Sequence, residues 1–301
     1  MDRLAAMRAF VAVAAQGSFS EAARRLRLSP SVVTRQIAQL EDELGLLLLN
    51  RTTRSVRLTE RGQIHLQSCH QILDDLDAAE RKVRGEDARP RGEMSVTAPI
   101  TFGRLHVLPI ITKILREHAD LSIRLTLSDR SIHLVEEGID IAVRIGELAD
   151  SSLVAVKLGQ VSRVVAASPA YLASRAPPRV PADLADHDLV VFEGLDVASE
   201  WRFGDGGLVV RVAPRLAVNS ADAAIVAAEA GLGITRAISY QVREAVIAGR
   251  LVPILQDFAP PPLPVSAVHP QRRIGSANVA AFVKAAREHF RAHPLGPLPT
   301  A

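Results

Sequence analysis

Residues 20–61 constrain the fold of this 301-residue chain more than any other segment. Two short amphipathic segments, SEAARRLRL and PSVVTRQIAQLEDEL, follow each other across a tight polar turn, and an arginine-bearing hairpin pattern comes next as LLLLNRTTRSVRL. This order is typical of a winged helix-turn-helix, whose second helix enters the major groove of DNA. The segment therefore predicts an N-terminal all-α winged module with double-stranded DNA as its partner.

The second helix of the pair is bounded by clear start and stop signals. Ser29 is a good N-cap because its hydroxyl can accept an amide hydrogen bond of the first turn, and Pro30 suits the first helical position. Gly45 suits the left-handed conformation that ends a helix. The apolar stripe expected to face the core consists of Val33, Ile37, Leu40 and Leu44.

The opposite face of this helix is small and polar, as a surface that enters a groove must be. We expect Ser31, Thr34 and Arg35 on this face, next to Ala38, to read bases. Arginines at the hairpin tip suit phosphate or minor-groove contacts. The predicted DNA contacts are Ser20, Ser29, Ser31, Val32, Thr34, Arg35 and Gln39 on the helices, and Arg51, Thr52 and Arg54 on the wing.

Other elements complete the predicted module. A first helix near 3–15 is expected to bury Met7, Phe10, Val11 and Ala14, and the helix that starts at Ser20 to bury Ala22, Ala23 and Leu26. Residues 46–49 are predicted as a buried strand, residues 55–58 as its partner, and 50–54 as the tip between them.

The charge distribution supports the DNA interpretation. Helix-turn-helix shapes also occur as plain packing units, so the motif alone leaves that alternative open. Residues 1–61, however, hold ten arginines and six acidic residues, a net charge of +4, whereas residues 62–301 carry −1. The positive charge is concentrated in the module that would contact nucleic acid.

A long helix capped by Thr59 is predicted next. Its apolar residues recur at four-three spacing, which is typical of a coiled-coil seam that pairs two copies of a chain. The seam consists of His65, Cys69, Ile72, Leu76, Ala79 and Val83, widened by Leu66 and Leu73. The alternative is an ordinary helix packed on its own module. Residues 85–92, GEDARPRG, are predicted as a hinge.

From residue 93 onward, strands alternate with helices, which predicts mostly parallel sheets with helices on both faces. Strands are expected at 94–98, 123–127, 139–145, 161–167, 189–192, 209–212 and 215–218, and helices at 103–117, 131–138, 221–230 and 277–291.

Ligands of such sheets bind beyond the carboxyl ends of the strands. Thr101 stands near a helix start, where amide groups favour an anion such as a carboxylate. For each candidate the alternative is a helix cap or a turn, and for Trp201 a place in the core. The candidate effector-binding residues are Thr101, Ser128, Asp129, Trp201, Asn219 and Thr235.

These features together resemble the LysR-type transcriptional regulators. Residues 4–62 look like that family's DNA-binding signature, with Leu48-Leu49 where the family often has Leu-Phe. The resemblance continues through LVEEGIDIAVRIGEL, SPAYL, EAGLGI and PPPLPV, and so covers essentially the whole chain.

The resemblance implies three parts and an oligomer. A winged helix-turn-helix would occupy 1–61, a linker coiled-coil helix with a hinge 62–92, and a two-lobed effector domain similar to periplasmic binding proteins 93–301. The lobes would be 93–163 with 268–295, and 164–267, joined by crossing strands near 163–167 and 264–268 around an effector cleft. Homodimers or homotetramers are implied.

The sequence contains no catalytic or metal-binding pattern. Its nine histidines form no HExxH pair, no GxSxG elbow is present, and GDGG at 204–207 is predicted as a hairpin turn. We therefore expect neither an enzyme nor a cofactor. The alternative function is a solute-binding or transport receptor, which a processed N-terminus would support.

Cysteine content and hydropathy bear on localisation. The single cysteine, Cys69, excludes a disulfide framework, and no apolar run approaches a membrane span. The apolar run 9–15 is a possible secretory signal, but Asp2 and the amphipathic continuation argue against it. The expected localisation is cytoplasmic.

Overall fold

The computed structural model describes residues 2–51, 56–84, 89–130, 134, 137–148, 153–194, 200–205, 208–273, 275–296 and 298. The chain divides into two compact units, Met1–Gly92 with Val135–Gly138, and Glu93–Leu134 with Ile139–Ala301. Among the helices of the described residues, none is long and apolar enough to span a bilayer.

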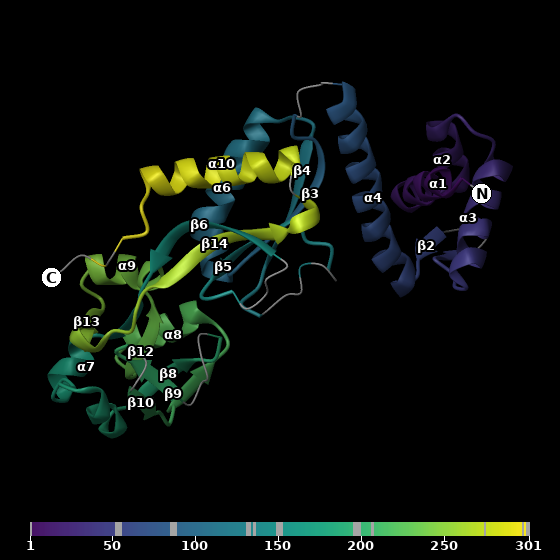
Figure 1. Ribbon diagram of the computed structural model, residues 1–301. Helices are drawn as coiled ribbons and strands as arrows, with labels where there is room; N and C mark the ends of the chain where they lie inside the picture. Colours follow the sequence, from purple (N-terminus) through teal and green to yellow (C-terminus); the bar gives the residue numbers. More distant parts are fainter. Residues whose placement is uncertain are drawn as a thin grey trace. The chain divides into compact units, whose positions relative to one another are not determined.

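The first unit is a helical module with a small hairpin and a long final helix (Figure 1). Its elements are α1 (Arg3–Gln16), α2 (Phe19–Leu26), α3 (Pro30–Leu44), β1 (Leu49–Arg51), β2 (Val56–Leu58) and α4 (Glu60–Arg84). The hairpin is antiparallel, with Leu49 opposite Leu58. Ala22 and Ala23 of α2 and Val33, Ile37 and Leu40 of α3 are buried in its core, as predicted.

The first two helices differ in detail from the sequence prediction. α1 buries Ala6, Met7, Ala9, Phe10, Ala12 and Val13, whereas Val11 and Ala14 of the predicted stripe are only half-buried. The small alanines let α1 contact α2, α3 and α4 at once, so its buried face is broad. α2 begins at Phe19 rather than Ser20, because Ser18 is the N-cap and its Oγ accepts the N–H of Glu21 at 3.4 Å.

The leucine run after α3 is not the strand that was predicted. The strand begins only at Leu49, and Leu46 and Leu47 are 37% and 65% exposed. Gly45 takes a left-handed φ of 68° and ends α3, as predicted. A Cβ at Gly62 would collide with the carbonyl oxygen of Leu48, so this close approach of α4 to the hairpin requires glycine.

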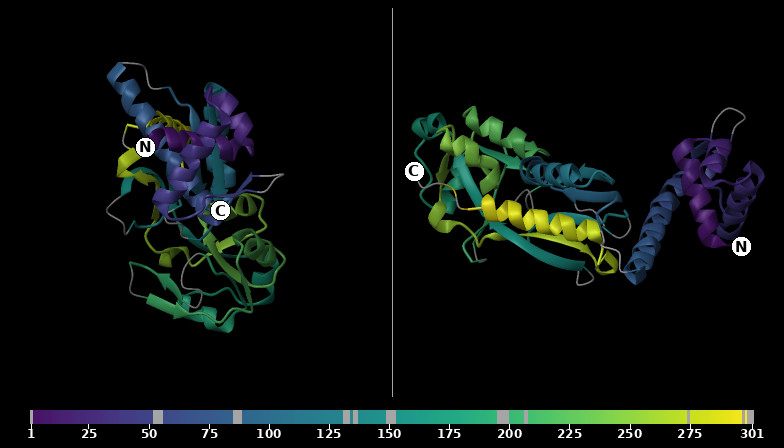
Figure 2. Two further views of the ribbon diagram at one scale, coloured as in Figure 1. Left: turned by 90° about the vertical axis from the view of Figure 1, so that its right-hand side faces the viewer. Right: turned by 90° about the horizontal axis from the view of Figure 1, so that it is seen from above.

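The second unit has two lobes, each built on a five-stranded sheet. The first sheet has the order β4-β3-β5-β14-β6. Its strands are β3 (Gly92–Ala98), β4 (Leu121–Leu127), β5 (Ile141–Ile145), β6 (Leu153–Val161) and β14 (Leu263–Pro270). The helices that pack on it are α5 (Ile100–Phe102), the π-helical turn η1 (Gly103–Val107), α6 (Leu108–Glu117) and α10 (Ala277–Ala292). α10 lies along the long strands β6 and β14 (Figures 1 and 2).

The second sheet has the order β11-β8-β12-β7-β13. Its strands are β7 (Arg163–Ala167), β8 (Leu189–Phe192), β11 (Leu216–Val218), β12 (Ile234–Ile238) and β13 (Val252–Ile254). A separate antiparallel hairpin is formed by β9 (Glu200–Phe203) and β10 (Leu208–Arg211). Helical elements of this lobe are α7 (Pro169–Ser174), α8 (Ala221–Glu229), α9 (Ser239–Ile247) and the 3-10 turns η2 (Pro181–Asp186) and η3 (Gln256–Phe258); a further turn, η4 (Gln271–Arg273), follows β14.

Both sheets are mixed rather than mostly parallel. β3 pairs with β5 and β8 with β11 and β12 in parallel, but the strands that connect the lobes return antiparallel to their neighbours. The strand predicted at 161–167 is two strands, β6 and β7, which belong to different sheets. All of β14 pairs within the first sheet, so residues 263–267, predicted for the second lobe, belong to the first. Most of the helix predicted at 131–138 lies outside the described residues.

Candidate functional site

The exposed face of α3 brings together the residues predicted to contact DNA. Ser29 caps the helix, with its Oγ accepting the N–H of Val32 at 3.4 Å, and lies 3.0 Å from Ser31 Oγ. Thr34 Oγ1 donates to the carbonyl oxygen of Pro30 at 2.8 Å. The exposed members of the predicted set are Ser20, Ser29, Ser31, Thr34, Arg35 and Gln39, and Val32 is half-buried. A polar helical face of this kind suits direct contact with base edges.

The hairpin is attached to α3 by a buried carboxylate that the sequence analysis did not single out. Glu41 is 5% exposed, and its Oε1 accepts the N–H groups of Leu48 and Leu49 at 2.9 and 3.1 Å. Thr59 Oγ1 donates to Leu47 O at 2.9 Å and accepts the N–H of Gly62 at 2.8 Å. The start of the wing is thereby tied to both α3 and α4, and Thr59 caps α4 as predicted.

The wing tip is only partly described. Arg51 closes β1 opposite Val56. Thr52 and Arg54, both predicted to contact DNA, lie outside the described residues. The predicted role of this tip therefore stays a prediction.

The seam predicted on α4 begins in the core of its own module. Cys69 is fully buried in that core, and burial raises the pKa of its thiol to about 11. The His65 ring lies 5.7 Å from the ring of Phe10 on α1, and burial lowers the pKa of this imidazole. Leu66 and Leu73 pack on the same core. Cys69 is therefore not a seam residue, because α1 covers this side of α4.

The remaining seam positions are less covered. Ile72 is 42% exposed and Leu76 is half-buried. The side chains of Ala79 and Val83 lie outside the described residues. An apolar residue such as Ile72 at the surface of a helix is available to a second chain.

A cavity of about 250 Å³ lies between the two lobes of the second unit; we call it the interlobe cavity. The first lobe contributes the end of β3, residues that follow β4, part of β5 and the start of β14. The second lobe contributes the start of β7 and residues at and after the ends of β8 and β12. The cavity therefore lies where mixed α/β sheets bind ligands, beyond the carboxyl ends of strands.

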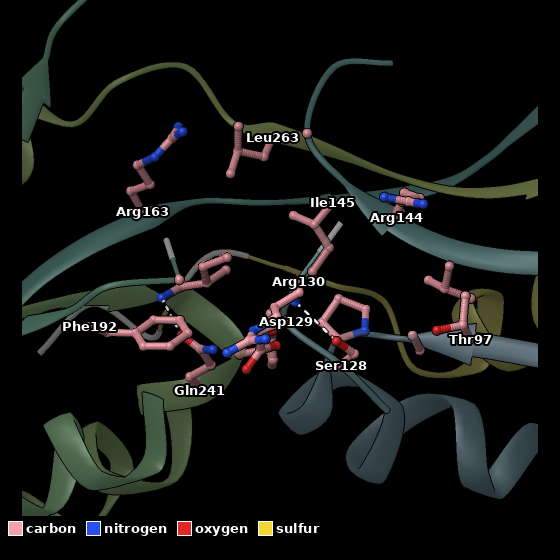
Figure 3. A pocket seen from close by; sticks show the side chains of 17 residues that line it. Thr97, Ser128, Asp129, Arg130, Arg144, Ile145, Arg163, Phe192, Gln241 and Leu263 are labelled. Carbon is pink, nitrogen blue, oxygen red and sulfur yellow. Dashed lines mark hydrogen bonds between the residues drawn. The ribbon is translucent and has the colours of Figure 1, made fainter. Parts of the chain in front are cut away.

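Three of the four charged side chains that line this cavity are arginines. Arg130, Arg144 and Arg163 line it, together with one carboxylate, Asp129 (Figure 3). The Asp129 Oδ1 accepts the N–H of Ile100 at 3.0 Å, so this carboxylate serves the start of the helix that follows β3. The three guanidiniums favour an anionic ligand, since arginine pairs with carboxylates in bidentate geometry.

Ser128 and Asp129 line the interlobe cavity, as predicted. Ser128 Oγ accepts the N–H of Arg130 at 3.1 Å, which orders the turn after β4 (Figure 3). Ser128 therefore orders a turn and Asp129 caps a helix start, which are the roles that the sequence left open as alternatives to ligand binding.

Aromatic side chains form another part of the lining. Tyr240 is 9% exposed, and burial raises the pKa of its hydroxyl, which stays a donor at neutral pH. Its ring packs edge-on against Phe102 with 5.1 Å between the ring centroids. Phe192 lies at the end of β8, and Gln241 accepts the N–H of Ile238 at 2.8 Å (Figure 3). The cavity thus offers an apolar wall beside its arginines.

Four of the predicted effector residues do not line this cavity. Thr101 is 4% exposed, and its Oγ1 lies 3.2 Å from Oδ1 of Asp222 on α8. Arg104 lies 3.9 Å from the other carboxylate oxygen of Asp222. Thr101 therefore connects the two lobes through Asp222 instead of lining the cavity.

The other three residues are placed by the second lobe's own sheet and hairpin. Trp201 lies in β9, is 2% exposed and packs in the lobe's core, which was the alternative to a ligand contact. Thr235 is fully buried in β12, and Asn219 is exposed after β11. For Trp201 and Thr235, burial within the lobe decides against a ligand contact in the interlobe cavity.

Local sequence patterns did not predict most of the residues that line the interlobe cavity. Arg130 directly follows two predicted residues, but nothing local separates it from an ordinary surface arginine. The lining residues that the sequence analysis missed include Arg130, Arg144, Arg163, Phe192, Tyr240 and Gln241. In the part of the chain that the structure describes, no three His, Cys, Asp or Glu side chains gather as a metal site requires.

Comparison with known proteins agrees with both parts of this arrangement. Residues 4–63 match the model of the bacterial regulatory helix-turn-helix proteins of the lysR family, and residues 87–291 match the LysR substrate binding domain. A transcriptional repressor of Pseudomonas aeruginosa is 36% identical over 98% of this chain and 94% of its own length. The transcriptional activator AaeR of Escherichia coli is 30% identical over 96% of this chain and 94% of its own length.

A solved structure is similar over nearly the whole chain. CrgA, a LysR-type transcriptional regulator from Neisseria meningitidis, is 30% identical with a TM-score of 0.58, over 97% of this chain and 98% of that chain. A transport receptor has no use for the DNA-binding module, so that alternative is not favoured. With a helix-turn-helix at its start and a substrate-binding domain over two thirds of its length, the chain belongs to the LysR family of DNA-binding transcriptional regulators.

Proposed function

We propose that this regulator binds its operator through the exposed face of α3 and responds to a small organic anion held in the interlobe cavity. The observation that carries the effector part is that Arg130, Arg144 and Arg163 all line one cavity. Guanidiniums in a partly enclosed site attract an anion more strongly than they do in water.

The size and walls of the cavity narrow the class of ligand. A cavity of about 150 Å³ holds one benzene molecule, and the interlobe cavity has about 250 Å³. The difference leaves room for a carboxylate, and Phe192 and Tyr240 in the lining supply aromatic surface beside it. A small aromatic carboxylate therefore fits both the charge and the shape.

The ligand would act by shifting the balance between arrangements of the two lobes. Thr101, Arg104 and Asp222 already connect the lobes at one point. A ligand that contacts both lobes binds one arrangement of the lobes more tightly than another. The equilibrium between the arrangements can shift only by that difference in affinity.

We also propose that two copies pair through α4, so that two reading helices meet a two-fold operator. Ile72 and Leu76, which the module's own core leaves partly uncovered, support this pairing. Pairs can assemble further into tetramers.

The DNA part is tested by replacing Arg35 with alanine. We expect the specific operator complex to lose about 1–3 kcal/mol, with a smaller loss on scrambled DNA of equal length. Arg116→Ala, on an exposed position of α6, is the charge-matched control. The measurement is fluorescence anisotropy of labelled DNA from the region beside the protein's own gene, at fixed salt. Wild-type affinity in Arg35→Ala would remove this residue from the reading face.

The effector part is tested with benzoate and its uncharged isostere benzamide. We expect benzoate, and not benzamide, to change transcription from that operator, and Arg130→Gln to weaken the response to benzoate. Arg124→Gln is the control, because Arg124 lies on β4 and pairs with Glu93 away from the cavity. Equal responses to benzoate and benzamide, or an equal loss in both variants, would contradict the anion assignment.

A further inference from the structure

A second cavity, of about 220 Å³, lies in the second lobe; we call it the second-lobe cavity. We propose that it is a second ligand site, which takes a small carboxylate with an apolar ring or chain. This site goes beyond the effector role proposed above for the interlobe cavity. The residues that line it come from β7, β9, β12, β13 and the segments that follow them, and include Leu298 near the end of the chain.

The second-lobe cavity is cationic. Arg163 on β7, Arg202 on β9 and Arg236 on β12 line it, and no Asp or Glu is found among the described residues of its wall. Ser239 lines it as well, with its Oγ accepting the N–H of Ser162 at 3.2 Å, which leaves the hydroxyl proton available to an acceptor. The wall thus offers charged and neutral donors to one anionic group.

Arg236 is held at this cavity by the core of the lobe. It is 4% exposed, its guanidinium carbon lies 5.0 Å from the ring centroid of Trp201, and its Nη1 donates to Arg202 O at 3.4 Å. Aromatic contact and a strand position limit the rotamers of this side chain. A guanidinium fixed in low-dielectric surroundings attracts an anion in the adjoining cavity more strongly than an exposed one does.

The rest of the wall is apolar, which decides against a bare inorganic ion. The apolar part consists of Val165, Phe203, Pro253, Ile254, Leu255 and Leu298, among others. A cavity of about 150 Å³ accepts a six-membered hydrocarbon ring, so about 220 Å³ accepts such a ring with a carboxylate. Phosphate or sulfate would pair with the arginines and leave the apolar wall without contacts.

Trp201 provides a readout that belongs to this cavity. The sequence contains one tryptophan. Its ring contacts the Arg236 guanidinium and does not line the interlobe cavity. A ligand whose carboxylate pairs with Arg236 changes the surroundings of the Trp201 indole. Tryptophan fluorescence of the full-length protein therefore reports on ligand binding in the second-lobe cavity.

The experiment is a fluorescence titration with cyclohexanecarboxylate, which does not absorb in the tryptophan band. We expect a saturable change, and binding at least about tenfold weaker for cyclohexanecarboxamide, which lacks the charge. Absence of a saturable change, or equal binding of acid and amide, would overturn the proposal.

Variants separate the two cavities. Arg163 lines both cavities, so the test uses Arg202 and Arg236, which line the second-lobe cavity alone. Arg236→Gln should abolish the titration. Arg202→Gln should raise the apparent Kd about threefold to tenfold, a modest effect because the side chain is 64% exposed. If Arg236→Gln does not fold, Arg202→Gln decides the test.

Two matched controls complete the design. Arg211→Gln, on the neighbouring strand β10 opposite Glu200, should titrate as the wild type does. Arg130→Gln, in the interlobe cavity, should also leave the tryptophan titration unchanged. The proposal is wrong if Arg202→Gln and Arg211→Gln behave alike, or if Arg130→Gln removes the signal.

Discussion

Replacing Glu41 with leucine is expected to loosen the wing of the DNA-binding module. The Glu41 Oε1 accepts the N–H groups of Leu48 and Leu49, and both leucines are buried, at 0% and 2% exposed. A buried N–H without an acceptor costs about 1–3 kcal/mol, so two cost about 2–6 kcal/mol. The leucine side chain recovers about 1.5–3 kcal/mol through burial. At the centres of these two ranges, the free energy of unfolding of the module should fall by about 2 kcal/mol.

Glu41→Gln is the matched control, since its Oε1 can still accept both hydrogen bonds. It should lose only about 1 kcal/mol, the difference between a charged and a neutral acceptor. Hydrogen exchange followed by mass spectrometry reads the amides of Leu48 and Leu49 directly, and operator affinity reads the consequence for DNA binding. Faster exchange at these amides in the leucine variant alone is the expected result. Equal protection in the two variants would refute the idea that this carboxylate holds the wing.

Three further predictions concern the lobes, pH and assembly. A double-mutant cycle of Thr101→Val and Asp222→Ala should show coupling of about 1 kcal/mol in unfolding of the effector unit, and additive effects would contradict the hydrogen bond between them. Burial and two neighbouring histidines lower the pKa of His106 from 6.5 to about 4. The folded state holds the neutral ring, so the contribution of His106 to the free energy of unfolding is fully present above pH 6.5. This contribution is lost as the pH falls from about 6.5 toward 4, and it amounts to about 2 kcal/mol after allowance for solvent. Thermal unfolding of His106→Phe should therefore depend less on pH in that window, and an unchanged pH profile would argue against this assignment. Leu76→Glu should weaken self-association in sedimentation experiments and reduce operator binding, whereas normal assembly would place the pairing surface elsewhere.

Short-range sequence patterns determined the DNA-binding module. Ser29, Pro30 and Gly45 mark the ends of α3 through backbone chemistry that acts within one turn of helix, and all three take the predicted roles. The three-four spacing of Val33, Ile37 and Leu40 predicted the buried face for the same reason. The start of α2 was missed by one residue, because Ser18 and Ser20 are both acceptable caps and only the structure distinguishes them.

Contacts between residues far apart in sequence decided the rest. In the sequence, Glu41 resembles an exposed surface charge, and only its contact with the start of the wing shows that it is buried. Cys69 fits the seam pattern in the sequence, and only its place in the core beside α1 shows that it does not belong to the seam. Trp201 was a candidate for effector binding, but the pairing of β9 with β10 holds it in the core of the second lobe. Arg130, Arg144 and Arg163 line one cavity only because β4 and β5 of the first lobe end beside the start of β7 in the second lobe. No local periodicity predicts that these three arginines lie near one cavity, because burial and proximity across a mixed sheet depend on how the whole chain folds.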